Sequence, residues 1–125
     1  GTLKGKKITV LGLAFKPDTD DIRESRSEVV INKLLDEEAI VTGHDPEAMD
    51  NFSQICNIEM ASNTEDAIGG ADCIILMTEW QEYINLDYKL IKQKMSGNVI
   101  IDGRRAFDYR RMEGAGFDYK AIGLG

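Results

Sequence analysis

Short apolar runs alternate with helix-forming segments along the whole chain. Two of the runs, residues 72–78 (DCIILMT) and 98–102 (NVIID), are continuously apolar, which is typical of central parallel strands with both faces buried. Further strands are expected at residues 7–13, 39–43, 58–60 and 118–122, with helical segments at 47–54, 64–68, 88–95 and 109–114. Right-handed crossovers turn this order into an α/β fold, a Rossmann-like doubly wound parallel sheet of about six strands in the order 3-2-1-4-5-6, with helices on both faces.

The longest expected helix follows the first strand and carries its own start signal. Ser25 and Glu28 have the S-x-x-E spacing of a capping box, in which the two side chains bind each other's backbone amides. Apolar residues then recur on one side of the helix and polar residues on the other. The apolar stripe consists of Val30, Ile31, Leu34 and Leu35, and we expect it to cover the sheet.

Composition bounds the class of protein. With 125 residues, 42% of them apolar, the chain is long enough for one domain, residues 1–125, and too short for two. A net charge of −7 argues against nucleic acid or an anionic membrane as a partner. No apolar run approaches the roughly 20 residues of a membrane span. We expect a cytoplasmic protein and, because the chain starts at Gly1 without Met, a piece of a longer one.

The cysteines and the histidine do not suggest a metal site. Cys56 and Cys73 lack a C-x-x-C spacing, and His44 is the only histidine. Cys73 lies inside an apolar run, so we expect it to pack in the core.

Cationic residues follow two of the expected strands. In open parallel sheets, ligands bind outside the carboxyl ends of the strands, where the winding reverses. Lys16 follows the first strand, and residues 104–111 (RRAFDYRR), which begin with Arg104, follow the fifth. A lysine and the planar fork of an arginine suit a diphosphate. We therefore expect Lys16 and Arg104 to meet over one anion-binding groove.

The first loop lacks the glycines of a dinucleotide site. A G-x-G-x-x-G turn lets the backbone approach a pyrophosphate, whereas this loop reads G-L-A-F-K-P from Gly12. Ala14 and Lys16 stand where further glycines would help. The turn is therefore not expected to cradle a nicotinamide cofactor.

Several polar and aromatic residues near the strand ends have two interpretations. The acidic residues of the loop are read as a turn-forming and capping set rather than a metal site, with Arg23 pairing with one of them. Asp45 could contact a ribose or start a turn, and Trp80 could stack on a base, although packing is favoured for it. Arg110 and Arg111 are expected to be surface charges. The acidic set consists of Asp18, Asp20, Asp21 and Glu24.

The motifs GLAFKPDTDDIRES, ILMTEWQEY and VIIDGRR, in this order, resemble the carboxyl-terminal, nucleotide-sugar-binding domain of the UDP-glucose/GDP-mannose dehydrogenases. The resemblance covers essentially the whole chain. It implies that Phe15 and Lys16 contact the UDP-sugar substrate, that Arg104 binds it, often across a subunit boundary, and that Arg23 reaches toward NAD held by an amino-terminal domain. The T-E-W and D-G-R-R forms are closer to the UDP-glucose 6-dehydrogenase branch than to the GDP-mannose or N-acetylmannosamine branches.

The resemblance also implies the chemistry of the parent protein, a homo-oligomer in which two NAD molecules oxidise a sugar alcohol to a carboxylate through a thioester. The family's nucleophile lies in a G-x-C-x-P context that neither Cys56 nor Cys73 has. We therefore expect no catalytic residue here and no activity from this domain alone. Two alternatives stay open, a stand-alone nucleotide- or CoA-binding module and a Mg²⁺-dependent phosphoryl-transfer domain using D-x-D-D.

Overall fold

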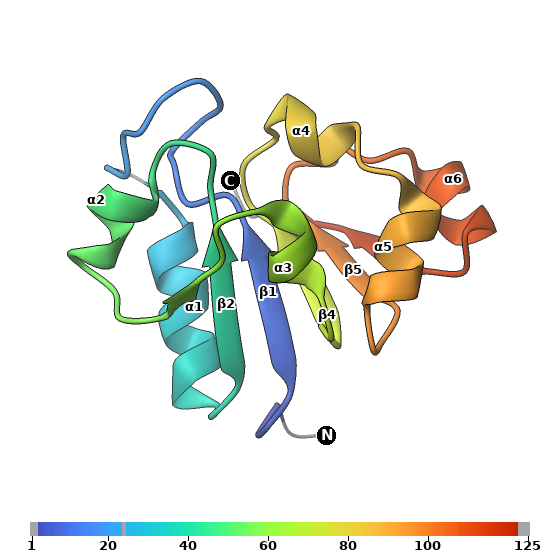
Figure 1. The fold of residues 1–125 in the computed structure, drawn as a ribbon, viewed down its shortest axis with the longest axis horizontal. Coiled ribbons are helices and arrows are strands. Elements are labelled where there is room, and N and C mark those ends of the chain that lie inside the picture. The colour runs from blue at the N-terminus through green and yellow to red at the C-terminus, as the bar shows by residue number, and fades with distance from the viewer. Residues whose placement is uncertain (1–2, 24, 123–125) are drawn as a thin grey trace.

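Six parallel strands form one sheet in the computed structural model, which describes residues 3–23 and 25–122 (Figure 1). The strand order is β3-β2-β1-β4-β5-β6, and all five pairings are parallel. This confirms the predicted fold class and winding. The strands are β1 (Lys7–Leu11), β2 (Ile40–His44), β3 (Glu59–Met60), β4 (Cys73–Leu76), β5 (Val99–Asp102) and β6 (Asp118–Ala121).

Helices connect the strands on both sides of the sheet. Figure 1 shows α3 and α5 on the near side and α1 on the far side. The helices are α1 (Ser27–Asp36), α2 (Met49–Ser53), α3 (Thr64–Ile68), α4 (Gln81–Ile84), α5 (Tyr88–Lys94) and α6 (Tyr109–Gly114). The prediction missed α4, whose four residues are too few to show a helical period.

The start of α1 differs from the prediction. The helix begins at Ser27 after Arg26, which makes no side-chain cap. The Ser25 hydroxyl accepts the amide of Ser27 at 3.2 Å instead of an amide one turn into the helix. The predicted capping box is therefore wrong, because the amide of Ser25, which a box would pair with the Glu28 side chain, donates to the carbonyl oxygen of Ile22 at 3.1 Å.

A buried hydroxyl fixes the same end of α1 to the sheet. Ser27 is 1% exposed, and its hydroxyl donates to the carbonyl oxygen of Gly12 at 2.7 Å. The stripe that faces the core consists of Ser27, Ile31 and Leu34. Leu35 is exposed, so the predicted stripe was too wide by one position.

The two faces of the central strands are covered unequally. On one face, Ile74, Leu76 and Ile100 are at most 1% exposed. There the hydroxyl of Thr9 also donates to the carbonyl oxygen of Ala67 in α3. On the other face, Cys73 is only half-buried, and so are its neighbours Val99 and Ile101. The prediction that these strands are buried on both faces therefore holds for one face only, because on the other face α1 packs against β2.

Within residues 3–23 and 25–122, no helix combines the length and the apolarity needed to cross a membrane. Both cysteines are free thiols, and Cys56 is buried.

Candidate functional site

The loops that follow the strands gather at one edge of the sheet, the upper edge in Figure 1. Residues 12–26 follow β1, residues 77–80 follow β4, and residues 103–108 follow β5. All the site residues predicted from the sequence lie in these loops. Two buried carboxylates, Asp45 and Asp102, hold the loops in place.

Asp45 joins three of the loops. It is fully buried and directly follows β2. Its Oδ2 accepts the amides of Leu13 and Ala14 at 2.8 and 3.0 Å and the indole N–H of Trp80 at 3.1 Å. Its Oδ1 accepts the amides of Glu47 and Ala48 at 2.9 and 2.8 Å. Five donors stabilise the buried carboxylate in the way that water otherwise would.

These bonds decide between the interpretations left open for Asp45 and Trp80. Both oxygens of Asp45 are committed to the protein, so in this structure the carboxylate organises turns and does not present itself to a ribose. Trp80 is 8% exposed and packs in the core, as the sequence favoured.

The turn after β1 has no free amides at the position where a dinucleotide fold binds pyrophosphate. The amides of Leu13 and Ala14 both donate to Asp45. Gly12 has a φ of +104°, and a Cβ on it would lie 2.5 Å from the Thr78 side chain. The glycine is therefore required for close contact between β1 and the β4 loop rather than for approach of a cofactor. The described residues of this turn do not fit the pyrophosphate of NAD.

Residues 15–21 form a closed loop that presents its side chains outward. The amide of Phe15 donates to the carbonyl oxygen of Asp21 at 2.7 Å, and Asp18 adopts a φ of 66°. Phe15 is 43% exposed, and Lys16 is exposed beside it. Both side chains are therefore accessible from solvent at the carboxyl edge of the sheet.

Arg23 pairs with Asp21, as the sequence predicted for one of the acidic residues. Its guanidinium donates to both oxygens of Asp21, at 2.9 Å from one terminal nitrogen and at 3.0 and 3.3 Å from Nε. These bonds, helped by the charge of Arg23 and by that of Lys16, lower the pKa of Asp21 to about 2. Glu24 lies outside the described residues. Across residues 3–23 and 25–122, no three His, Cys, Asp or Glu side chains form a group that could hold a metal ion.

Asp102 organises the loop after β5 in the way that Asp45 organises the loop after β1. It is fully buried and accepts the amides of Arg104, Ala106 and Phe107 at 2.8 to 3.0 Å. The hydroxyl of Tyr119 donates to it at 2.8 Å. Burial, followed by this bond to a carboxylate, raises the pKa of the Tyr119 hydroxyl. Sequence reasoning missed this role, although the D-G pair after an apolar run is a turn signal.

Arg104 is anchored at both its backbone and its side chain. Its amide donates to Asp102, and its Nε donates to Oε2 of Glu79 at 2.9 Å. The two side chains are 31% and 29% exposed. Glu79 comes from the loop after β4, the strand that lies between β1 and β5. Lys16 and Arg104 therefore extend from loops on the two sides of the β4 loop, at the same edge of the sheet, while their meeting over one groove stays a prediction.

A buried His and Tyr pair supports the same edge from below. The Tyr83 hydroxyl donates to the carbonyl oxygen of His44 at 2.9 Å and lies 2.7 Å from Nδ1 of that residue. The hydroxyl has one proton to give, so Nδ1 carries the proton of the imidazole. Burial lowers the pKa of His44 and raises that of Tyr83. Both side chains form hydrogen bonds inside the fold, so His44, the only histidine of the sequence, has a structural role.

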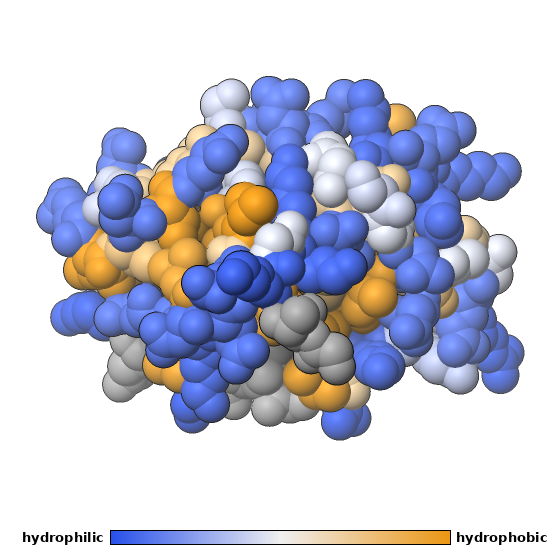
Figure 2. All heavy atoms as spheres, turned by 90° about the horizontal axis from the view of Figure 1, so that it is seen from below, coloured by the Kyte–Doolittle hydropathy of each residue, from blue (hydrophilic) through white to orange (hydrophobic). Residues whose placement is uncertain are grey.

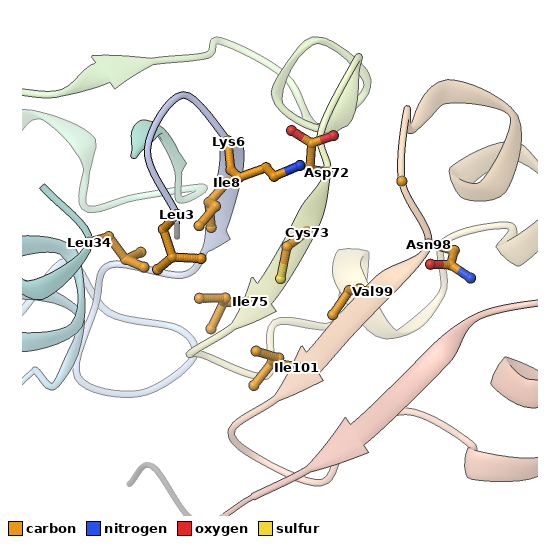
Figure 3. Close-up of a pocket in the computed structure, with 11 residues that line it drawn as sticks. Leu3, Lys6, Ile8, Leu34, Asp72, Cys73, Ile75, Asn98, Val99 and Ile101 are labelled. Atoms are coloured by element: carbon orange, nitrogen blue, oxygen red, sulfur yellow. The ribbon is translucent and has the colours of Figure 1, made fainter. Parts of the chain in front are cut away.

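The exposed face of β4 and β5 holds an apolar trough with a volume of about 410 Å³. Figure 3 shows Ile8, Ile75 and Ile101 pointing into it from three neighbouring strands, with Leu34 of α1 along one side. Lys6 and Asp72 stand at its rim. Viewed from the end at which the strands begin, hydrophobic residues show between hydrophilic ones (Figure 2).

Comparison with known proteins gives the chain its relatives. The model of the UDP-glucose/GDP-mannose dehydrogenase family, UDP binding domain, matches residues 9–109. A UDP-glucose 6-dehydrogenase of Rhizobium meliloti is 38% identical over 124 residues, which are 98% of this chain and 28% of the relative. The UDP-glucose 6-dehydrogenase AglM of Haloferax volcanii is 41% identical over 121 residues, 96% of this chain and 27% of the relative.

Solved structures agree with this match. An NDP-N-acetyl-D-galactosaminuronic acid dehydrogenase from Methanosarcina mazei superposes with a TM-score of 0.87 at 33% identity, over 98% of this chain and 25% of that one. A UDP-glucose dehydrogenase from Pyrobaculum islandicum superposes with a TM-score of 0.77 at 32% identity, over 98% of this chain and 26% of that one. The chain thus spans about a quarter of the length of these relatives. It belongs to the UDP-glucose/GDP-mannose dehydrogenase family, in which it matches the UDP binding domain.

Proposed function

We propose that this chain is the carboxyl-terminal, UDP-sugar-binding domain of an NAD-dependent UDP-glucose 6-dehydrogenase, which converts UDP-glucose and two NAD to UDP-glucuronate. The family match and the relatives' names support this assignment. The match covers about 28% of the Rhizobium relative. The proposal therefore includes amino-terminal and central domains of the same polypeptide, residues 1–125 being the third.

The observation that carries the proposal is the state of Arg104. Only its Nε has a side-chain partner, and both terminal nitrogens are without one among residues 3–23 and 25–122. The protein has seven more negative than positive charges, so a half-buried guanidinium with an open edge is a selective place for an anion. Phe15 and Lys16 complete the site from the other side of the β4 loop, the lysine on the diphosphate and the ring against an apolar part of the ligand.

NAD binds mainly to the amino-terminal domain in this proposal. The amides of Leu13 and Ala14, which would face its pyrophosphate, are bound to Asp45. From this domain, Arg23 reaches toward the cofactor over the exposed surface of the first loop, while Asp21 holds its guanidinium. When bound, NAD supplies the hydride acceptor of the reaction.

No residue of this domain is proposed as the nucleophile. Burial raises the pKa of the Cys73 thiol to about 11 and also raises that of Cys56, which leaves little thiolate at neutral pH. The domain alone is therefore not expected to oxidise a sugar. We place the parent enzyme in the cytoplasm as a homo-oligomer.

The test replaces the two cations in the full-length protein and measures NAD reduction against UDP-glucose concentration. Lys16→Ala and Arg104→Ala should each lower kcat/KM. The loss should correspond to a free-energy barrier that is higher by about 1.5–3 kcal/mol, the value of one charge-assisted hydrogen bond. The loss should appear mainly in KM. Lys89→Ala and Arg110→Ala remove the same charges from exposed helical positions and are the matched controls.

Unchanged kinetics for both Lys16→Ala and Arg104→Ala would refute the site. Turnover of GDP-mannose or UDP-N-acetylmannosamine in preference to UDP-glucose would move the protein to another branch of the family. UDP binding with no turnover of any of the three sugars would favour a binding module.

A further inference from the structure

We infer that Glu79 is a positioning residue of the UDP-sugar site, which holds Arg104 by its Nε so that the terminal edge of the guanidinium faces the ligand. The inference rests on the proposed function of Arg104 as a substrate-binding residue. Glu79 lies in the T-E-W motif, for which the family likeness implies no role.

Glu79 is held between two buried neighbours. The hydroxyl of Thr78, which is fully buried, donates to the carbonyl oxygen of Ala14 at 2.8 Å. The indole of Trp80 donates to Asp45 at 3.1 Å. The backbone of Glu79 can therefore move little, and its carboxylate is directed from a fixed base.

Arg104 has an equally firm base on the next strand. Leu76, the last residue of β4, pairs in register with Asp102, the last residue of β5. The loops that carry Glu79 and Arg104 thus leave neighbouring strands at the same level. Asp102 binds the amide of Arg104 directly, and the next residue, Arg105, adopts a φ of 54°. Only the Arg104 side chain is left to be oriented.

The bond between the two side chains selects one edge of the guanidinium. An arginine can bind an oxyanion along its Nε side or across its two terminal nitrogens. Glu79 occupies Nε at 2.9 Å, so the terminal edge is the one left open in the part of the chain that the structure describes. A phosphate or carboxylate can receive two parallel bonds there without displacing Glu79.

The contribution of Glu79 is mainly entropic. A free arginine side chain samples many rotamers, and part of this rotamer entropy is lost whenever a ligand is bound. Because Glu79 restricts these rotamers before the ligand arrives, binding costs less. This effect differs from a competing role, in which the carboxylate would have to leave Arg104 before the ligand could bind.

The experiment compares Glu79→Ala, Glu79→Gln and Arg104→Ala in the full-length protein, with UDP-glucose as the kinetic probe and UDP as the calorimetric one. Glu79→Ala should raise KM and the UDP dissociation constant about ten-fold, with kcat changed less than three-fold. Glu79→Gln should recover most of this loss, because its amide oxygen can still accept from Nε. Thermal unfolding should be the same for all three within a few degrees.

The double variant separates positioning from an independent effect. In an Arg104→Ala background, Glu79→Ala should change KM by less than about two-fold, because no guanidinium remains to be oriented. A full ten-fold loss there would overturn the inference. A lower KM for Glu79→Ala alone would also overturn it and would show that Glu79 competes with the ligand.

The same set of variants tells the two proposals apart. If Arg104→Ala raises KM but Glu79→Ala does not, the positioning role is wrong and the substrate site stands. If neither Arg104→Ala nor Lys16→Ala changes KM, the site itself is wrong and the inference falls with it.

Discussion

The carboxyl-edge loops and the apolar trough are two surfaces built on the same strands, β4 and β5. At the edge, Asp45 and Asp102 together accept nine hydrogen bonds, five and four, and hold loops whose exposed side chains include carboxylates as well as cations and an aromatic ring. The trough has a volume of about 410 Å³ and is lined mainly by aliphatic side chains.

The difference shows that volume and binding chemistry are separate properties. A diphosphate needs charged donors, which the proposed site at the edge takes from Lys16 and Arg104, whereas the trough has only Lys6 at its rim among its lining residues. The trough is a place where half-buried aliphatic groups affect stability. Substitutions in the trough should therefore change stability, and substitutions of the exposed cations at the edge should change substrate affinity. The buried carboxylates of the edge are the exception, because their loss should change stability.

The largest expected effect is the loss of a buried carboxylate at the edge. Asp45→Ala leaves five donors without their acceptor and should reduce the free energy of unfolding by about 3–5 kcal/mol, measured by urea denaturation. Asp45→Asn, which keeps one oxygen, should lie between this variant and the wild type. Asp118→Ala, at an exposed position of β6, is the control and should change the free energy of unfolding by less than about 0.5 kcal/mol. Equal stability of Asp45→Ala and the control would show that the edge is not held by this residue.

The trough should respond to truncation in stability alone. Ile75 is 5% exposed, and Ile75→Ala should cost about 2–4 kcal/mol through lost burial and the cavity that remains. Val99→Ala, at a half-buried neighbour, should cost about 1 kcal/mol. Neither should change KM for UDP-glucose in the full-length protein, measured beside Arg104→Ala. A KM increase as large as that of Arg104→Ala would mean that the trough contributes to the ligand site.

Substitutions at the start of α1 should reduce the free energy of unfolding by smaller amounts. Ser27→Ala removes a buried bond to the Gly12 carbonyl and should cost about 1–2 kcal/mol, whereas Ser25→Ala removes a longer, half-buried bond and should cost about 0.5 kcal/mol. Urea denaturation of the two variants measures the difference. A larger loss of stability for Ser25→Ala than for Ser27→Ala would favour the predicted capping box over the bonds seen in the structure.

The smallest effect concerns Asp21 on the exposed surface of the first loop. Its pKa is about 2 when it is bonded to Arg23, below that of an unfolded chain. The bond therefore contributes stability above about pH 4, and this contribution is lost as the pH falls through the folded value. Arg23→Ala should move the pKa from about 2 toward 3.8, which an NMR titration of the side-chain carboxyl would follow. An unchanged titration would mean that another group holds Asp21 ionised.

The strands β1, β2, β4 and β5 were predictable because each is a largely apolar local run, and the strand order followed from the handedness of the crossovers. The lysine and arginine of the edge could also be placed there from sequence position alone. The roles of Asp45 and Asp102 could not, because a D-P or D-G pair predicts a turn without showing which amides the carboxylate will accept. For Glu79 and Arg104 the difficulty is distance along the chain, since 25 positions separate two side chains that meet only because β4 and β5 are neighbours.

The amino-acid sequence by itself determined the α/β class, the winding of the sheet and the edge at which charged loops gather, because periodicity and turn residues act over a few positions. The tertiary structure alone decided which carboxylates are committed to the fold, which edge of Arg104 is left open by residues 3–23 and 25–122, and that one face of β4 and β5 is incompletely covered. Those features depend on groups from separate strands and helices, whose distances are fixed only when the whole sheet has formed.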